Sequence, residues 1–172
     1  MNLKEKFMGD LKNIFNLFLE VLAEDAPVSP VVEAELAEIN RRHVVRVGAL
    51  CDDYDEQLQV VSERYEDEAR AVLSALRNKL GDNLEEFAGM LRQGVEVETA
   101  KARALEKARQ QRSEAREEAA RIQMELDRSI EGLSREWAAK AEVILREAEA
   151  ECNQLLLSAG LAELTFRGTD PN

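Results

Sequence analysis

The chain has 172 residues and a formal net charge of −12, with 34% charged and only 5% aromatic residues. This length suits one ordinary domain, but so few aromatic side chains argue against a compact globular core. Many helix-forming residues and only three prolines favour long helices with a narrow core seam. The negative charge argues against nucleic acid and anionic lipid as general partners, because their phosphates repel it.

The first predicted element is an amphipathic helix within residues 1–25, followed by a linker at 26–29. Its apolar residues recur every three or four positions and therefore share one wide face. The candidate partner or membrane contacts on this face are Phe7, Leu11, Phe15, Phe18 and Leu22. Pro27 and Pro30 cannot lie inside a helix, so the next helix is predicted to start at Ser29 and Pro30.

The second predicted element is a long helix that starts at residue 30 and carries an 11-residue apolar repeat. Its seam residues are Val32, Leu36, Ile39, His43, Val47, Leu50, Tyr54, Leu58, Val61, Tyr65, Ala69, Val72, Leu76 and Leu80. Such a repeat is close to 3.67 residues per turn, so the seam stays straight or winds gently to the right. A helix of this length should measure roughly 75 Å.

The third predicted element runs from about residue 82 to 161. Its last part repeats the same rhythm through Leu126, Ile130, Leu133, Trp137, Ala141, Ile144, Ala148, Cys152, Leu155 and Ala159. Its middle follows a heptad rhythm with a thin alanine seam, made of Leu105, Ala108, Arg112, Ala115, Ala119 and Ile122. Residues 162–172 have no periodicity and are predicted to be a flexible tail.

Two glycines compete for the turn between the long helices. Gly81 and Asp82 resemble a helix end followed by a new N-cap, whereas Gly94 would give two helices of equal length. Residues 50–70 hold eight acidic and two basic residues (net −6), and residues 99–121 hold seven basic and four acidic residues (net +3). Opposite charges tend to face each other along a coiled coil, so the charges favour a turn near 81–83 over one near 94.

The sequence therefore predicts an all-α fold, an elongated antiparallel helical hairpin or coiled coil with a short N-terminal amphipathic helix. In domain terms, the N-terminal helix covers 1–25, the linker 26–29, the hairpin 30–161 and the tail 162–172. A turn near 81–83 pairs the helix at 30–80 with residues 83–133. The first helix then docks at the open end, where Trp137, Ile144 and Leu155 receive Phe7, Phe15 and Phe18.

Three polar or aromatic residues are candidates for register or partner contacts. His43 is the only histidine and lies in the seam, which favours a polar residue paired across the helices over a pH sensor or ligand. Arg112 either extends to solvent or an acidic flank, or binds a partner's carboxylate. Trp137 lies in the seam of the last helix. Cys51 and Cys152 are expected to be buried reduced thiols, which fits the cytoplasm.

No catalytic, cofactor or metal site is expected, because the sequence has no glycine-rich phosphate loop, no nucleophile with a base and no Cys/His metal spacing. The acidic run DDYDE at 52–56 lacks the glycine of a calcium loop. The basic stretch 99–121 has no interleaved aromatic residues, which argues against binding to single-stranded nucleic acid. No segment is predicted to span a membrane.

The layout of KFMGDLKNIFNLFLEVLAEDAP followed by a long hairpin is similar in outline to the phage-shock and plastid vesicle-inducing proteins, bacterial relatives of ESCRT-III. This resemblance implies polymers that coat membranes, with Phe7, Phe15 and Phe18 inserted into lipid. The stretch AREEAARIQMEL is also similar to peripheral-stalk subunits of rotary ATPases.

The function expected from the sequence is that of a non-enzymatic helical scaffold or accessory subunit. Its partners would be further copies of itself, a larger protein complex or both, without nucleic acid. The alternative is a peripheral membrane protein that forms polymers through its N-terminal amphipathic helix, with residues 1–24 on the membrane surface.

Overall fold

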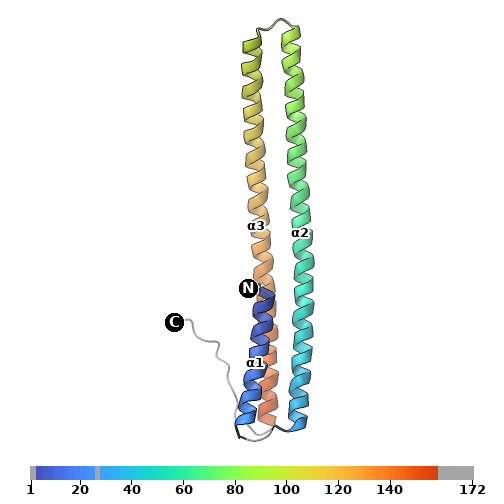
Figure 1. The fold of residues 1–172 in the computed structure, drawn as a ribbon, viewed down its shortest axis with the longest axis vertical. Coiled ribbons are helices and arrows are strands. Elements are labelled where there is room, and N and C mark those ends of the chain that lie inside the picture. The colour runs from blue at the N-terminus through green and yellow to red at the C-terminus, as the bar shows by residue number, and fades with distance from the viewer. Residues whose placement is uncertain (1–2, 26–27, 159–172) are drawn as a thin grey trace, which may run out of the picture. The chain divides into compact units, whose positions relative to one another are not determined.

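The computed structural model describes residues 3–25 and 28–158, which form three helices and, within these ranges, no strand. The helices are α1 (Leu3–Asp25), α2 (Pro30–Arg92) and α3 (Val97–Ser158). Helices α2 and α3 form a helical hairpin, and α1 lies beside the end of the pair where α2 begins and α3 ends (Figure 1). The predicted all-α class and the hairpin are confirmed.

The helices divide into two compact units, and the long helices take part in both. Unit 1 comprises the described residues of Met1–Glu56 and Leu133–Asn172, and unit 2 is Gln57–Gly132. Unit 1 therefore contains α1 together with parts of α2 and α3, whereas unit 2 consists of two helices only. This difference in helix number decides which apolar side chains are covered.

Helices α2 and α3 run antiparallel within each unit. In unit 1, Arg42 bonds to Glu151 and Tyr54 to Ser134. In unit 2, Tyr65 bonds to Ser129, and Asn83 bonds to the backbone of α3 near residue 104. Residue numbers on α3 fall as those on α2 rise, as an antiparallel pair requires.

The predicted seam of α2 is confirmed at every position. Each of the residues expected from Val32 to Leu80 is buried or half-buried, and none of them is exposed. The predicted seam of α3 from Leu126 to Leu155 is buried or half-buried in the same way, while Ala159 lies outside the described residues. The 11-residue spacing therefore identified the contact line of both helices.

The turn of the hairpin lies at residues 93–96, and the preferred prediction of a turn near 81–83 is wrong. Helix α2 continues through Gly81 and Asp82 to Arg92. The amide of Gly94 donates to the Leu91 carbonyl (3.1 Å) and the amide of Val95 to the Met90 carbonyl (3.0 Å). With Gly94 at a φ of 84°, these bonds form a Schellman motif that ends the helix. The alternative position near Gly94 is the observed one.

The two glycines should respond in opposite ways to alanine. Gly94→Ala is expected to lower the free energy of unfolding by about 1–2 kcal/mol, because a Cβ is unfavourable at positive φ. Gly81→Ala should raise it by about 0.5–1 kcal/mol, because Gly81 lies inside a helix and an added Cβ there meets no atom within 4 Å. Urea unfolding followed by circular dichroism measures both. Equal effects of the two variants would contradict the assigned turn.

The predicted charge register is also wrong. Lys107, in the basic stretch of α3, pairs with Glu86, and Glu114 pairs with Lys79 at 3.6 Å. The basic stretch 99–121 therefore faces the end of α2 and not the acidic stretch 50–70. The expected pairing of 30–80 with 83–133 fails for the same reason, because the turn lies about a dozen residues later than predicted.

Other predicted boundaries are partly covered by the structure. The start of α2 is confirmed, since the Glu33 amide donates to the Ser29 carbonyl at 3.0 Å. Residues 26–27 of the linker, the expected helix end at 161 and the tail 162–172 lie outside the described residues.

Candidate interaction surfaces

The apolar face of α1 is buried in the core of unit 1. Phe7, Leu11, Phe15, Phe18 and Leu22 all belong to one hydrophobic cluster with residues of α2 and α3. The predicted docking against Trp137, Ile144 and Leu155 is confirmed, because these three belong to the same cluster. The five residues proposed as partner or membrane contacts are thus already occupied within the chain.

Trp137 anchors this cluster through three different contacts. Its ring meets the ring of Phe7 edge-on at 5.1 Å and lies tilted against Tyr54 at 5.7 Å. Its indole N–H donates to the Leu50 carbonyl of α2 at 3.1 Å. Trp137 therefore ties α1, α2 and α3 together and acts as a core residue of unit 1.

His43 is a buried polar residue at the contact between α2 and α3, as the register interpretation predicted. Its side chain is only 1% exposed, and its Nε2 lies 3.1 Å from Glu151 Oε1. The other oxygen of Glu151 accepts from Arg42 at 2.6 Å, and Arg46 pairs with Glu147 on the same pair of helices. These bonds match one specific register of α2 against α3.

The pKa of Glu151 lies below its ordinary value. Burial alone would raise this pKa, but the hydrogen bond and charge of Arg42, together with those of His43, outweigh burial. A carboxyl group with a lowered pKa in the folded state stabilises the fold above its unfolded pKa, and that stability is lost as pH falls through the folded value.

Glu151→Gln is therefore expected to destabilise unit 1 at pH 7 by about 1 kcal/mol, because the pair with Arg42 and His43 is weakened. The difference from the natural chain should shrink as pH falls below about 4, where an ordinary glutamate is protonated. Urea midpoints at pH 7 and pH 3 measure this. Glu35→Gln, at an exposed position of α2, is the control and should change little. An equal effect of Glu151→Gln at both pH values would contradict the prediction.

Both cysteines are free and buried in the core of unit 1, as the sequence suggested. Burial raises the pKa of Cys152 to about 12, with the negative charge of Glu151 acting in the same direction. Burial also raises the pKa of Cys51. The positive charge of Lys4 opposes this increase, whereas the negative charges of Asp55 and Asp52 add to it. The acid–base state of both residues is that of neutral thiols.

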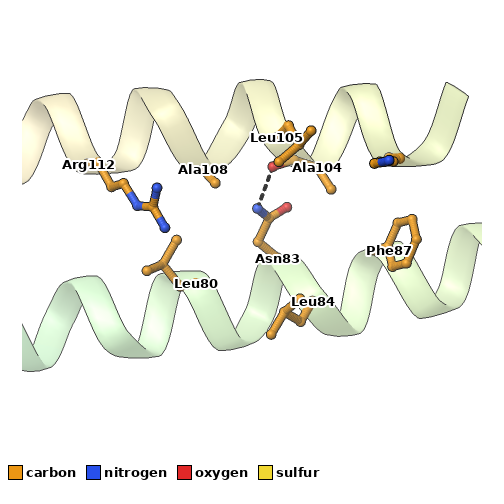
Figure 2. Close-up of a pocket in the computed structure, with 9 residues that line it drawn as sticks. Leu80, Asn83, Leu84, Phe87, Ala104, Leu105, Ala108 and Arg112 are labelled. Atoms are coloured by element: carbon orange, nitrogen blue, oxygen red, sulfur yellow. Dashed lines mark hydrogen bonds between the residues drawn. The ribbon is translucent and has the colours of Figure 1, made fainter. Parts of the chain in front are cut away.

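Unit 2 contains an open apolar groove between α2 and α3, with a volume of about 390 Å³. Its lining residues are Leu80, Asn83, Leu84, Phe87, Lys101, Ala104, Leu105, Ala108 and Arg112. Asn83 is buried and donates from its side-chain amide to the Ala104 carbonyl at 2.8 Å. Figure 2 shows this bond and shows the Arg112 side chain extending from α3 toward Leu80 of α2.

Large leucine side chains stay exposed on both helices of unit 2. Leu73 is 66% and Leu84 68% exposed, and Leu91 and Leu105 are exposed as well. Single exposed leucines are common on protein surfaces. Two of these leucines, Leu84 and Leu105, line the same apolar groove, and such an exposed apolar patch indicates an interaction site.

The sequence predicts this groove only in part. It indicates Arg112 as a seam residue, whereas the structure exposes Arg112 on the groove wall. Leu105 and Ala119 are exposed as well, so the predicted heptad seam is wrong at three positions. The observed contact line of α3 instead passes through Ala100, Ala104, Ala108, Gln111, Ala115, Glu118 and Ile122. Leu73 and Asn83 were not singled out, although leucines 11 residues apart at positions 73 and 84 were a visible signal.

A second groove on the same helix pair has a different character. It is lined by Val72, Ala75, Leu76, Lys79, Gln111, Glu114, Ala115 and Glu118. Here Lys79 of α2 pairs with Glu114 of α3, so the charges at this groove compensate each other across the helices.

Within residues 3–25 and 28–158, no group of three or more His, Cys, Asp or Glu side chains is placed to hold a metal ion. In the same ranges, no helix combines the length and apolarity that crossing a bilayer demands. Comparison of the chain with protein-family models, with curated proteins and with solved structures finds no match in any of the three.

Proposed function

We propose that the chain is a non-enzymatic interaction protein, a helical scaffold or accessory subunit that assembles with copies of itself or docks on a larger complex. The observation that carries this proposal is the contrast between the two units. In unit 1 a third helix covers the α2–α3 pair, and in unit 2 leucines remain exposed beside an apolar groove. A partner that covers these leucines would gain about 25 cal/mol for each Å² of apolar surface removed from water.

Contacts inside unit 1 also support the proposal. The bonds of His43, Arg42 and Glu151 favour one register of α2 against α3 within this unit. We also propose a cytoplasmic location, which the two free cysteines support because disulfides are rare there.

The alternative function, a membrane-bound polymer resembling phage-shock proteins, receives less support. It requires the apolar face of α1 to enter lipid, yet that face is buried against α2 and α3. Exposing it would forfeit about 1.5–3 kcal/mol for each large apolar side chain. Lipid would have to compensate for this loss before any net binding.

Two measurements test the proposal. Lysine-reactive cross-linking in cells is expected to join Lys79 or Lys101 of unit 2 to another polypeptide, either a second copy or a different protein. Cross-links confined to single chains would count against an interaction role. Sedimentation with anionic vesicles is expected to leave the chain in the supernatant, and pelleting with the vesicles would favour the membrane alternative.

A further inference from the structure

The 11-residue repeat allows positions of unit 2 to be compared with positions that α1 covers in unit 1. Residues 51, 73 and 84 are separated by 22 and 11 residues and therefore occupy the same position of the repeat. Cys51 belongs to the cluster that includes the apolar face of α1 and is 2% exposed. Its equivalents Leu73 and Leu84 are larger and more apolar, yet they are 66% and 68% exposed. This position of the repeat is covered at Cys51 in unit 1, whereas in unit 2 it holds the half-buried Ser62 and the uncovered leucines Leu73 and Leu84.

The same comparison on α3 shows how the two units differ in charge at one position of the repeat. Residues 101, 112, 145 and 156 share one position of the repeat, since they are separated by 11, 33 and 11 residues. In unit 1 this position holds Leu145 and Leu156, both in or against the cluster. In unit 2 it holds Lys101 and Arg112, and the intervening positions hold Gln123 in unit 2 and Ser134 in unit 1. A position that carries leucines of the core cluster in unit 1 thus carries the two basic residues of the groove in unit 2.

The two basic residues of this groove have no internal counter-charge. Neither Lys101 nor Arg112 makes an ion pair with a residue in the described ranges, and no acidic residue lines the groove. In contrast, their neighbours Lys107 and Arg109 pair with Glu86 and Glu106. The groove thus offers apolar contacts and two cations that are free to bind carboxylates.

From these features we infer that the groove of unit 2 binds an amphipathic helix of a partner protein whose flanks are acidic. The inference rests on the proposed function and names the partner's chemistry. Its apolar anchors should follow the spacing of α1, where Phe7, Leu11, Phe15, Phe18 and Leu22 step by 4, 4, 3 and 4 residues. Helix-in-groove recognition uses such anchors, and acidic flanks would pair with Lys101 and Arg112.

Unit 1 supplies a precedent for this charge matching. There α1 brings Lys4 close enough to Cys51 for its charge to act on that thiol, alongside Asp52 and Asp55 of α2. A basic helix end thus lies near an acidic stretch. A second copy of the chain is a poorer occupant of the unit 2 groove, because a two-fold contact of groove on groove would bring Lys101 and Arg112 of both copies together. Like charges at an interface oppose association.

The test uses the full chain and a fluorescent helical peptide with leucines at i, i+4, i+8, i+11 and i+15 and glutamates at the flanking positions. Fluorescence anisotropy is expected to show saturable binding that weakens as salt rises. Leu84→Glu should weaken binding about tenfold or more, because a carboxylate replaces a central apolar contact. Lys101→Glu combined with Arg112→Glu should weaken it by at least about tenfold.

Matched controls separate groove binding from general attraction. Arg103→Glu makes the same charge reversal on α3 at an exposed position outside the groove lining and should leave affinity within about twofold. A peptide with lysines in place of the glutamates should not bind. All substituted residues are exposed or line an open groove, so circular dichroism should report the same helix content for each variant.

Three results would overturn the inference. They are absence of binding by the acidic peptide, equal binding of the acidic and basic peptides, and unchanged affinity of Leu84→Glu. A dimer by light scattering that Leu84→Glu converts to a monomer would assign the groove to a second copy instead. That last result would leave the proposed interaction function standing, whereas chains that show no cross-link to any other polypeptide in cells would remove it.

Discussion

Deletion of residues 1–25 is expected to destabilise unit 1 more than any single substitution in the chain. The deletion removes five large apolar side chains from the core cluster, each worth about 1.5–3 kcal/mol when buried. The gross loss is on the order of 10 kcal/mol, reduced by the entropy that α1 no longer loses on ordering. Urea unfolding should therefore show an early transition for unit 1 that the full chain lacks.

Trp137 provides a direct optical measurement of this effect. It is the only tryptophan in the chain, and Phe7 of α1 lies against its ring. Without α1 the indole should become accessible to water, and its emission maximum should shift to longer wavelength. Leu17→Ala, at an exposed position of α1, is the control and should leave emission and stability nearly unchanged. An unshifted emission maximum in the truncated chain would show that α1 does not cover Trp137.

Trp137→Ala is expected to lower the free energy of unfolding by about 3–5 kcal/mol, the usual range for removal of a large buried aromatic residue. The substitution leaves a cavity between three helices and removes the hydrogen bond to the Leu50 carbonyl. Chemical unfolding followed by circular dichroism measures the loss. Trp137→Phe should lose less, because it keeps an aromatic ring against Phe7 and Tyr54.

Val143→Ala tests whether the effect of Trp137→Ala depends on burial. Val143 lies on the same helix but is exposed, so its truncation should change stability by no more than about 0.5 kcal/mol. Similar losses for Trp137→Ala and Val143→Ala would mean that Trp137 does not pack at the centre of unit 1.

The seam and the docking of α1 could be predicted because both depend on periodicity. Spacings of three and four residues place side chains on one helix face whatever the partner. The 11-residue rhythm of residues 32–80 was long enough to fix that face over many turns. For the same reason His43 could be identified as a residue of the helix contact before its partner Glu151 was known.

The prediction of a turn at 81–83 is wrong because the capping signals at Gly81 and Asp82 are local and do not include the packing of α2 against α3. A glycine is tolerated in a helix at a cost of about 0.5–1 kcal/mol, which the packing of α2 against α3 offsets. At Gly94 the backbone adopts positive φ, and no feature of the sequence distinguishes that requirement from the helical conformation of Gly81.

The charge-based prediction of the register is wrong, and most of the ion pairs among the described residues lie within a single helix. Arg121 pairs with Glu118 and Glu125, and Arg70 pairs with Glu66 and Asp67, three or four residues away in each case. Such local pairs engage side chains of a single helix, so they do not specify which stretch of the opposite helix faces it. The total charge of a stretch is therefore a weak guide to register.

The groove of unit 2 could not be predicted from the sequence because alanines occur on more than one face of α3. Alanines occur both on the observed contact line, at Ala104, Ala108 and Ala115, and beside it, at the exposed Ala119 and Ala120. Hydropathy alone cannot tell which of these alanines face α2. The predicted heptad seam shares Ala108, Ala115 and Ile122 with this contact line. It also includes Leu105 and Arg112, and the structure places both of these residues on the groove wall.

The buried cysteines allow local opening of unit 1 to be measured. Alkylating reagents attack the thiolate form, and Cys152, with a pKa of about 12 and no exposed surface, offers almost none of it while unit 1 stays closed. Modification of Cys152 must therefore wait for a local opening of the three helices. The rate at which this thiol is modified thus reports how often the core of unit 1 opens.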